Sequence, residues 1–232
     1  MSDSIFTFIS SHHIIFAGIF GIIPAILWLW FWLKEDIHPE PTKLIIFTFL
    51  SGMLSVFIAL PMQHWVENIT KGTILLFLLW AVIEESLKFG AAWIGGMHTR
   101  EDNEPIDPTI YMIVSALGFV AMENTLFLID PLISGNIGDA LITGNLRFMG
   151  ATLLHVVSSS TIGIFLSLSF TKKRAYKIIY AILGLILAST LHTLFNLFIM
   201  NGSDSSIFLI FGAVWIGLIA LMVTFEKIKS IN

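Results

Sequence analysis

The sequence contains no cysteine, which excludes disulfide bonds, a thiolate nucleophile and any metal site built on cysteine ligands. Charged residues are also scarce: they make up 12% of the 232 residues, and no segment is polar enough to form a separate soluble domain. The net charge of −4 gives no indication of a nucleic-acid partner. Any chemistry must therefore come from carboxylates, histidines and hydroxyls.

Apolar residues dominate what is present. Hydrophobic side chains make up 56% of the chain, and the mean hydropathy of +0.88 lies far above that of soluble domains. Stretches long enough to cross a bilayer core of roughly 30 Å recur throughout. They must be helical, because lipid offers no partners to free backbone groups. The sequence predicts an all-α, polytopic transmembrane helical bundle that forms a single integral-membrane domain over residues 1–232.

Seven membrane spans are expected, and the first is a retained anchor because it lacks the basic segment and cleavage site of a signal peptide. The predicted spans cover residues 14–33, 43–62, 73–97, 109–129, 148–170, 177–200 and 206–224. If the N-terminus is outside, nine basic residues lie in inner segments and only two, Lys71 and Arg147, in outer ones. The positive-inside rule therefore predicts an N-out, C-in protein. The lack of glycosylation-rich outer domains fits the cell membrane of a prokaryote.

The longest outer connector, residues 130–147, has two possible structures. Ile133, Ile137 and Leu141 follow helical spacing between Gly-Asn pairs, which is compatible with a short amphipathic helix on the membrane surface. A flexible loop fits the same residues equally well.

The third predicted span contains three ionisable residues, Glu84, Glu85 and Lys88, in the segment AVIEESLKFGAAW. Such groups are costly in lipid, so they usually face a protein interior and serve a function. Glu84 and Lys88 are four positions apart and share a helix face, which makes the lysine a counter-ion for Glu84. Glu85 points about 100° away. Two carboxylates this close cannot both ionise cheaply, so one should hold a proton, as general acid–base chemistry requires.

Three further spans carry polar side chains. Glu123 and Asn124 lie in the fourth, His155 lies in the Ser-rich fifth, and His192 and Asn196 share one face of the sixth. Depth is counted from the outer end of each span at about 1.5 Å per residue. By this count Glu84, Glu123, His155 and His192 all lie about 10 to 15 Å deep. The helices alternate in direction, so this agreement is not a result of sequence spacing. It predicts a single site in the outer half of the bilayer.

Together these residues resemble the PrsW-type intramembrane proteases, which are related to the CAAX prenyl protease and bacteriocin-processing (ABI) superfamily. The resemblance covers roughly residues 75–200 and rests on Glu84-Glu85-x-x-Lys88, Phe119-x-x-x-Glu123-Asn124, a histidine in a Ser-rich span and His192-x-x-x-Asn196. Glu123 stands where the broader superfamily has a histidine, and Lys88 where it has an arginine. Both departures fit the PrsW branch and argue against processing of prenylated proteins.

The resemblance implies an intramembrane endopeptidase whose catalytic core spans approximately residues 73–200. Its substrate would be a single-pass membrane protein, similar to an anti-sigma factor, cut near its extracytoplasmic side. The expected partners are that substrate and the lipid bilayer, with no nucleic acid.

The predicted catalytic residues are Glu84, Glu85, Lys88, Glu123, His155, His192 and Asn196. Glu84 is assigned as the general base with Glu85 as its partner or proton shuttle, although the two could exchange roles. His192 and Asn196 could donate hydrogen bonds to the oxyanion, while His155 orients the water or protonates the leaving group.

A metal mechanism is also open. Two imidazoles and a carboxylate from separate helices form a plausible zinc set with one open position, and Glu123, His155 and His192 are the candidate ligands for Zn²⁺. No HExxH spacing supports this set.

Three other functions would also place polar side chains inside a membrane bundle. A proton-coupled membrane transporter would use the same buried Glu and His cluster, but the matched, broken half-repeats typical of such proteins are not evident. A retinal protein would need a lysine in the last span, which has none. Haem ligation by His155 and His192 would leave the three glutamates without a role.

Overall fold

The structure is a computed structural model that describes residues 11–36, 38–201 and 204–229. Within this part of the chain all regular structure is helical, as the sequence predicts. The elements are α2 (His13–Lys34), α3 (Thr42–Ile69), α4 (Thr73–Ala92), η1 (Trp93–Met97), α5 (Asp107–Ile133), α6 (Ile137–Leu146), η2 (Arg147–Ala151), α7 (Thr152–Leu168), α8 (Arg174–Asn201) and α9 (Asp204–Lys229).

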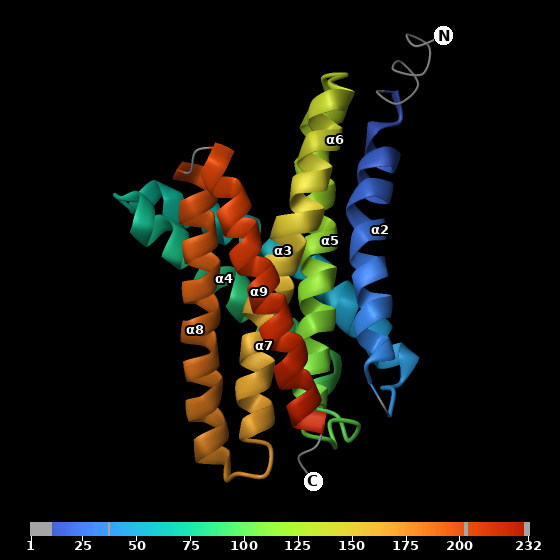
Figure 1. Cartoon of the computed structure of the whole chain (residues 1–232), viewed down its shortest axis with the longest axis vertical. Coiled ribbons are helices and arrows are strands. Elements are labelled where there is room, and N and C mark those ends of the chain that lie inside the picture. Colours follow the sequence, from blue (N-terminus) through green and yellow to red (C-terminus); the bar gives the residue numbers. More distant parts are fainter. Residues whose placement is uncertain (1–10, 37, 202–203, 230–232) are drawn as a thin grey trace.

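Among the described residues, six helical segments are long and apolar enough to cross a membrane: α2, α3, α5, the run from Ile137 to Leu168, α8 and α9. The predicted third span corresponds to α4 followed by the π-helix η1. Its three ionisable side chains make this segment less apolar than the other six, yet all three side chains are buried inside the protein. The helices are arranged as an up-and-down bundle in which α3 and α4 cross behind the others on a diagonal (Figure 1).

Successive connectors alternate between the two ends of the bundle. The end of α2, the start of α5, the α7–α8 turn and the end of α9 all lie at the lower end in Figure 1. These are the segments predicted to share the inner, Lys- and Arg-rich side. The structure thus agrees with the alternation of the spans, while the side of the membrane that each end faces stays a prediction.

The connector predicted between the fourth and fifth spans is neither a surface helix nor a flexible loop. Gly135 turns the chain with a φ of 70°, and the Asn136 side chain caps the new helix by accepting a hydrogen bond from the Asp139 backbone N–H at 3.2 Å. Helix α6 then continues through the π-helix η2 into α7. The backbone stays hydrogen-bonded throughout, so α6 extends α7 instead of lying across it.

Helix α5 is the centre of the bundle. Every residue from 107 to 121 is buried, and the helix packs against α2, α3 and α7. Two glycines allow α3 and α5 to touch: a Cβ at Gly52 would lie 2.2 Å from the Ser115 carbonyl oxygen, and one at Gly118 would lie 2.0 Å from that of Phe49. Small residues at such crossings let helix backbones approach closely in membranes.

Candidate active site

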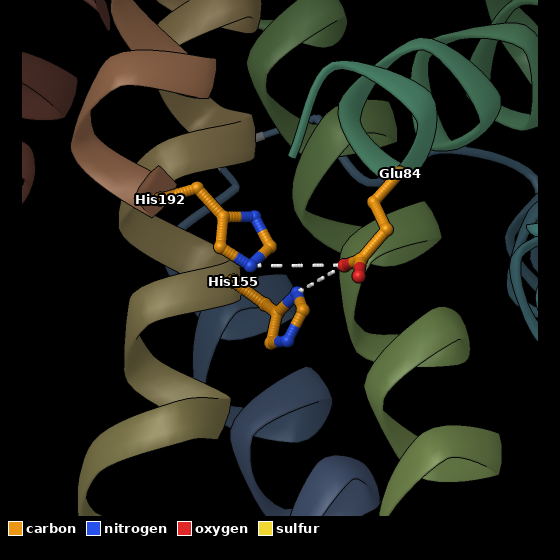
Figure 2. Close-up of side chains that lie close together, drawn as sticks. All are labelled: Glu84, His155 and His192. Carbon is orange, nitrogen blue, oxygen red and sulfur yellow. Dashed lines mark ion pairs between the residues drawn. The ribbon is translucent and has the colours of Figure 1, made fainter. Parts of the chain in front are cut away.

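Three of the predicted site residues meet in the bundle interior. Glu84 comes from α4, His155 from α7 and His192 from α8, and Figure 2 shows their side chains pointing toward one another. The Glu84 Oε2 atom lies 3.7 Å from His192 Nε2 and 4.0 Å from His155 Nδ1. The two imidazole rings are 4.9 Å apart and nearly perpendicular. All three residues are at least 95% buried, with exposures of 5%, 3% and 2%.

Glu85 has the most complete set of partners in the site. It accepts hydrogen bonds from Lys88 Nζ at 2.8 Å, Ser158 Oγ at 3.1 Å, Ser159 Oγ at 2.6 Å and His192 Nδ1 at 2.9 Å. Its side chain has no solvent exposure. A buried carboxylate is tolerated only when its lone pairs are satisfied in this way. Glu85 is therefore tied down and has little freedom to act on a substrate.

The lysine belongs mainly to Glu85. Lys88 Nζ lies 2.8 Å from Glu85 Oε1 but 3.6 Å from Glu84 Oε2, so the expected pairing of Lys88 with Glu84 is the weaker of the two. Lys88 can reach Glu85 because residues three positions apart on a helix are neighbours, just as residues four apart are. A Ser115 hydroxyl donates to the Lys88 backbone carbonyl at 2.7 Å and ties this turn of α4 to α5.

The two histidines present different ring nitrogens to the centre. A carboxylate can only accept, so the contact with Glu85 places the His192 proton on Nδ1 and turns Nε2 toward Glu84. For His155, Glu123 Oε2 accepts from Nε2 at 3.1 Å. The Lys88 ammonium, which can only donate, approaches His155 Nδ1 at 2.7 Å. Two carboxylates thus set opposite tautomers in the two rings.

Glu123 is held by an arginine from the next helix. Arg147, in η2, forms an ion pair with Glu123 Oε2 and donates from Nε to Asn124 Oδ1 at 2.5 Å. Its guanidinium lies 3.9 Å from the centre of the Phe127 ring. Glu123 therefore contacts the site through His155 Nε2, and its carboxylate does not lie between the two imidazoles.

A cavity of about 530 Å³ opens beside these residues. Its lining includes side chains of Glu84, Glu123, Arg147, His155, His192 and Asn196, with apolar residues from α3, α4, α5, α8 and α9 around them. Asn196 lies one turn beyond His192 on α8, as its spacing predicts. The cavity could admit water and an extended peptide segment next to the carboxylate and the histidines.

The residues at the centre are of the types that bind a divalent metal such as zinc, and they fit one once the Lys88 ammonium moves off His155 Nδ1. Glu84, His155 and His192 each offer one ligand atom, and these atoms all lie within 4.8 Å of one another. Glu84 Oε2 is buried and has no hydrogen-bond partner, which is unusual for a carboxylate oxygen unless an ion or water completes it. Two imidazoles and one carboxylate are a common catalytic zinc set. The carboxylate in this group is that of Glu84, whereas the sequence analysis placed Glu123 there.

Four contacts of the site were not predicted from sequence. Gln63 of α3 donates to Glu84 Oε1 at 2.8 Å, Arg147 holds Glu123, and Ser158 and Ser159 both reach Glu85. The sequence does carry a weak signal for Gln63, since it is a polar amide near the end of an apolar span. Arg147 was counted only as a charge of the outer connector.

Comparisons with known proteins identify relatives of this chain. A family model described as PrsW family intramembrane metalloprotease matches residues 40–225. The chain is 26% identical to Protease PrsW of Halalkalibacterium halodurans over 216 residues, 91% of this chain and 95% of that protein. It is 30% identical to Protease PrsW of Geobacillus kaustophilus over 126 residues, 53% and 56% of the two chains. The corresponding protein of Bacillus subtilis is 33% identical over 113 residues, 47% and 52% of the two chains. No solved structure matches.

Proposed function

The chain belongs to the PrsW family of intramembrane proteases, and on this premise we propose that it cleaves a single-pass membrane protein near the extracytoplasmic side of the bilayer, with Glu84 at the centre of the chemistry. It is a multi-pass membrane hydrolase, and its bacterial relatives indicate a prokaryotic source. The observation that carries the proposal is the buried Glu84 oxygen without a hydrogen-bond partner, which faces two imidazoles beside a cavity.

The position of the cleaved bond is inferred from where the residues lie along their helices. His192 is closer to the Asn201 end of α8 than to its Arg174 end, and Glu123 is closer to the Ile133 end of α5 than to its Asp107 end. Both of the nearer ends are predicted to be outside by the positive-inside rule. A substrate resembling an anti-sigma factor would then be cut on its outer side.

Peptide hydrolysis needs an activated water, an oxyanion stabiliser and a proton for the leaving amine. Glu84 Oε2 is the group best placed to accept the proton of a water in the cavity, because Glu85 is fully occupied. Asn196, one turn beyond His192 on the same face of α8, can donate to the developing oxyanion, and Glu84 can then pass the proton taken from water to the leaving amine. Lys88 and the two serines keep Glu85 in place, and Glu85 in turn orients His192.

Glu84, His155 and His192 would also hold the metal that the family description implies. When bound, a metal ion would supply a Lewis acid that activates water for attack on the peptide carbonyl. Either route uses the same carboxylate. Because the family consists of proteases, no observation favours the alternative function of a proton-coupled transporter.

The proposal is tested by reconstituting the purified protein in vesicles with a candidate single-pass substrate. We expect Glu84→Gln and His192→Ala to lose cleavage by at least about 1,000-fold, as removal of a central catalytic group usually does. Glu67→Gln and His98→Ala are matched controls, since both residues are exposed, and they should cleave normally.

Metal content measured on the same samples separates the two ligand sets. We expect Glu84→Gln and His192→Ala to lose stoichiometric zinc while Glu123→Gln retains it. Zinc lost with Glu123→Gln and His192→Ala but retained by Glu84→Gln would favour the ligand set predicted from sequence. Normal cleavage by both Glu84→Gln and His192→Ala would remove the assignment of this site.

A further inference from the structure

One oxygen of Glu84 is held from outside the predicted catalytic core. Gln63 of α3 donates from Nε2 to Glu84 Oε1 at 2.8 Å. The other oxygen, Oε2, is buried and has no hydrogen-bond partner. An ionised carboxylate only accepts hydrogen bonds, so the amide nitrogen of Gln63, and not its oxygen, must face Glu84. The two oxygens of one carboxylate thus have different surroundings.

Gln63 is itself fixed in place. Trp80 of α4 donates from its indole Nε1 to the Gln63 backbone carbonyl at 3.2 Å, which ties this turn of α3 to α4. Gln63 is half-buried, whereas Met62 and His64 on either side are exposed. Gln63, Trp80 and Glu84 all line the cavity. The amide therefore points inward from a fixed backbone and is not a solvated side chain that happens to touch the site.

The alternative partner for Glu84 is close. Lys88 Nζ lies 3.6 Å from Glu84 Oε2, near enough that a modest rotation of the carboxylate would form a direct ion pair. Such a pair would be strong in this buried setting and would withdraw Oε2 from the imidazoles. Gln63 opposes that rotation because turning the carboxylate would break its own hydrogen bond to Oε1.

We propose that Gln63 is a positioning residue that holds the Glu84 carboxylate with one oxygen aimed at His155 and His192. The proposal rests on the function assigned to Glu84 above. It adds α3, which lies before the predicted core of residues 73–200, to the catalytic machinery. A neutral amide suits this role, since a cation at the same place would pair with Glu84 and an anion would repel it.

The test compares Gln63→Met with the wild type in the vesicle cleavage assay. Methionine has a similar length and no donor, so packing is kept while the hydrogen bond is lost. We expect kcat to fall about 10- to 100-fold, as for other groups that orient a catalytic residue, and KM to stay unchanged. Zinc affinity should weaken by a similar factor. Asn68→Leu, an exposed amide on the same helix whose side chain bonds only its own helix backbone, should behave as wild type.

A double variant tests the hydrogen bond itself, while the change in kcat at constant KM in Gln63→Met separates positioning from a merely structural role. Gln63→Glu with Glu84→Gln restores the hydrogen bond with donor and acceptor exchanged. We expect its thermal stability to match the wild type and its cleavage to be lost. Wild-type kcat in Gln63→Met, or a raised KM with unchanged kcat, would overturn the proposal. Normal cleavage by Glu84→Gln would instead overturn the proposed function, so the two failures are distinguishable.

Discussion

Glu84 and Glu85 are adjacent in sequence but have opposite surroundings. Glu85 accepts from four donors and has no exposure, whereas one oxygen of Glu84 has no hydrogen-bond partner. Sequence reasoning left their roles exchangeable. Because both oxygens of Glu85 already accept hydrogen bonds, Glu85 is less free than Glu84 to take a further proton or ion, and the geometry supports Glu84 as the reactive group and Glu85 as the one that orients His192.

Arg147 gives a second test at the scale of single residues. Its ion pair fixes Glu123, which in turn accepts from His155 Nε2. Arg147→Met should free Glu123 and loosen the His155 ring, so we expect kcat to fall about 10- to 100-fold. The measurement is cleavage of the reconstituted substrate.

Two further variants interpret that result. Arg147→Lys should rescue poorly, since an ammonium cannot reach Glu123 and Asn124 together as the guanidinium does. Arg100→Met, at an exposed arginine, is the matched control. If Arg147→Met cleaved at the wild-type rate, the chain from Arg147 to His155 would have no role in catalysis.

At the scale of elements, the crossing of α3 and α5 decides where Gln63 and Glu123 can lie. The crossing depends on glycine at both contact points, Gly52 and Gly118. Helix α6 provides a second example, because its continuation through η2 into α7 brings Arg147 over the end of α5. Both arrangements rest on backbone contacts that hydropathy does not report.

Gly118→Ala should separate α3 from α5. Its new methyl group would lie 2.0 Å from the Phe49 carbonyl oxygen, and backbone cannot move aside as a flexible side chain can. We expect the free energy of unfolding to fall by about 1–3 kcal/mol, the usual cost of overpacking. Thermal unfolding in detergent is the measurement.

Gly18→Ala is the control for that substitution. A Cβ at Gly18 meets nothing within 4 Å, and alanine is the better helix former, so stability should be unchanged or slightly higher. Equal stability of Gly118→Ala and the wild type would show that the α3–α5 contact is looser than described.

At the scale of the whole molecule, contacts between connectors link the helices at the end opposite α6. Glu40, between α2 and α3, accepts a hydrogen bond from the Tyr111 hydroxyl of α5. His38 Nδ1 lies 2.8 Å from Glu104 Oε1, and Lys229 at the end of α9 lies 3.5 Å from Glu35. These contacts join helices that are distant in sequence.

The Glu40 contact predicts how stability depends on pH. Burial and the nearby Asp107 raise the pKa of Glu40 from 4.5 to about 8, and burial raises the pKa of Asp102 to about 7. Between about pH 4.5 and 8 the unfolded chain releases these protons while the folded protein keeps them. The free energy of unfolding should therefore fall as pH rises through this window and level off above it.

Unfolding measured from pH 5 to 9 checks this expectation. Glu40→Gln keeps the shape of the side chain and removes its titration, so its stability should fall less steeply with pH. A wild-type stability that rises between pH 5 and 8 would contradict the assigned direction, as would equal slopes for the two proteins.

The sequence alone determined the helical membrane fold, the seven apolar stretches and the small set of residues able to carry chemistry. It could do so because an ionisable group in lipid is too costly to keep without a purpose, so Glu84, Glu85, His155 and His192 stand out against an apolar background. The approximate positions of the spans followed from hydropathy and length in the same way, although the second helix extends to Ile69 and the fifth helical run begins at Ile137.

Only the tertiary structure decided which of those residues contact one another. Lys88 pairs more closely with Glu85 than with Glu84, Glu84 and not Glu123 shares the space between the imidazoles, and Gln63 and Arg147 hold the two carboxylates. Helical spacing gives the face on which a side chain lies but not its partner on another helix. Those partners depend on the close crossing of α3 and α5 and on the α6–α7 continuation, which arise from packing between distant parts of the chain.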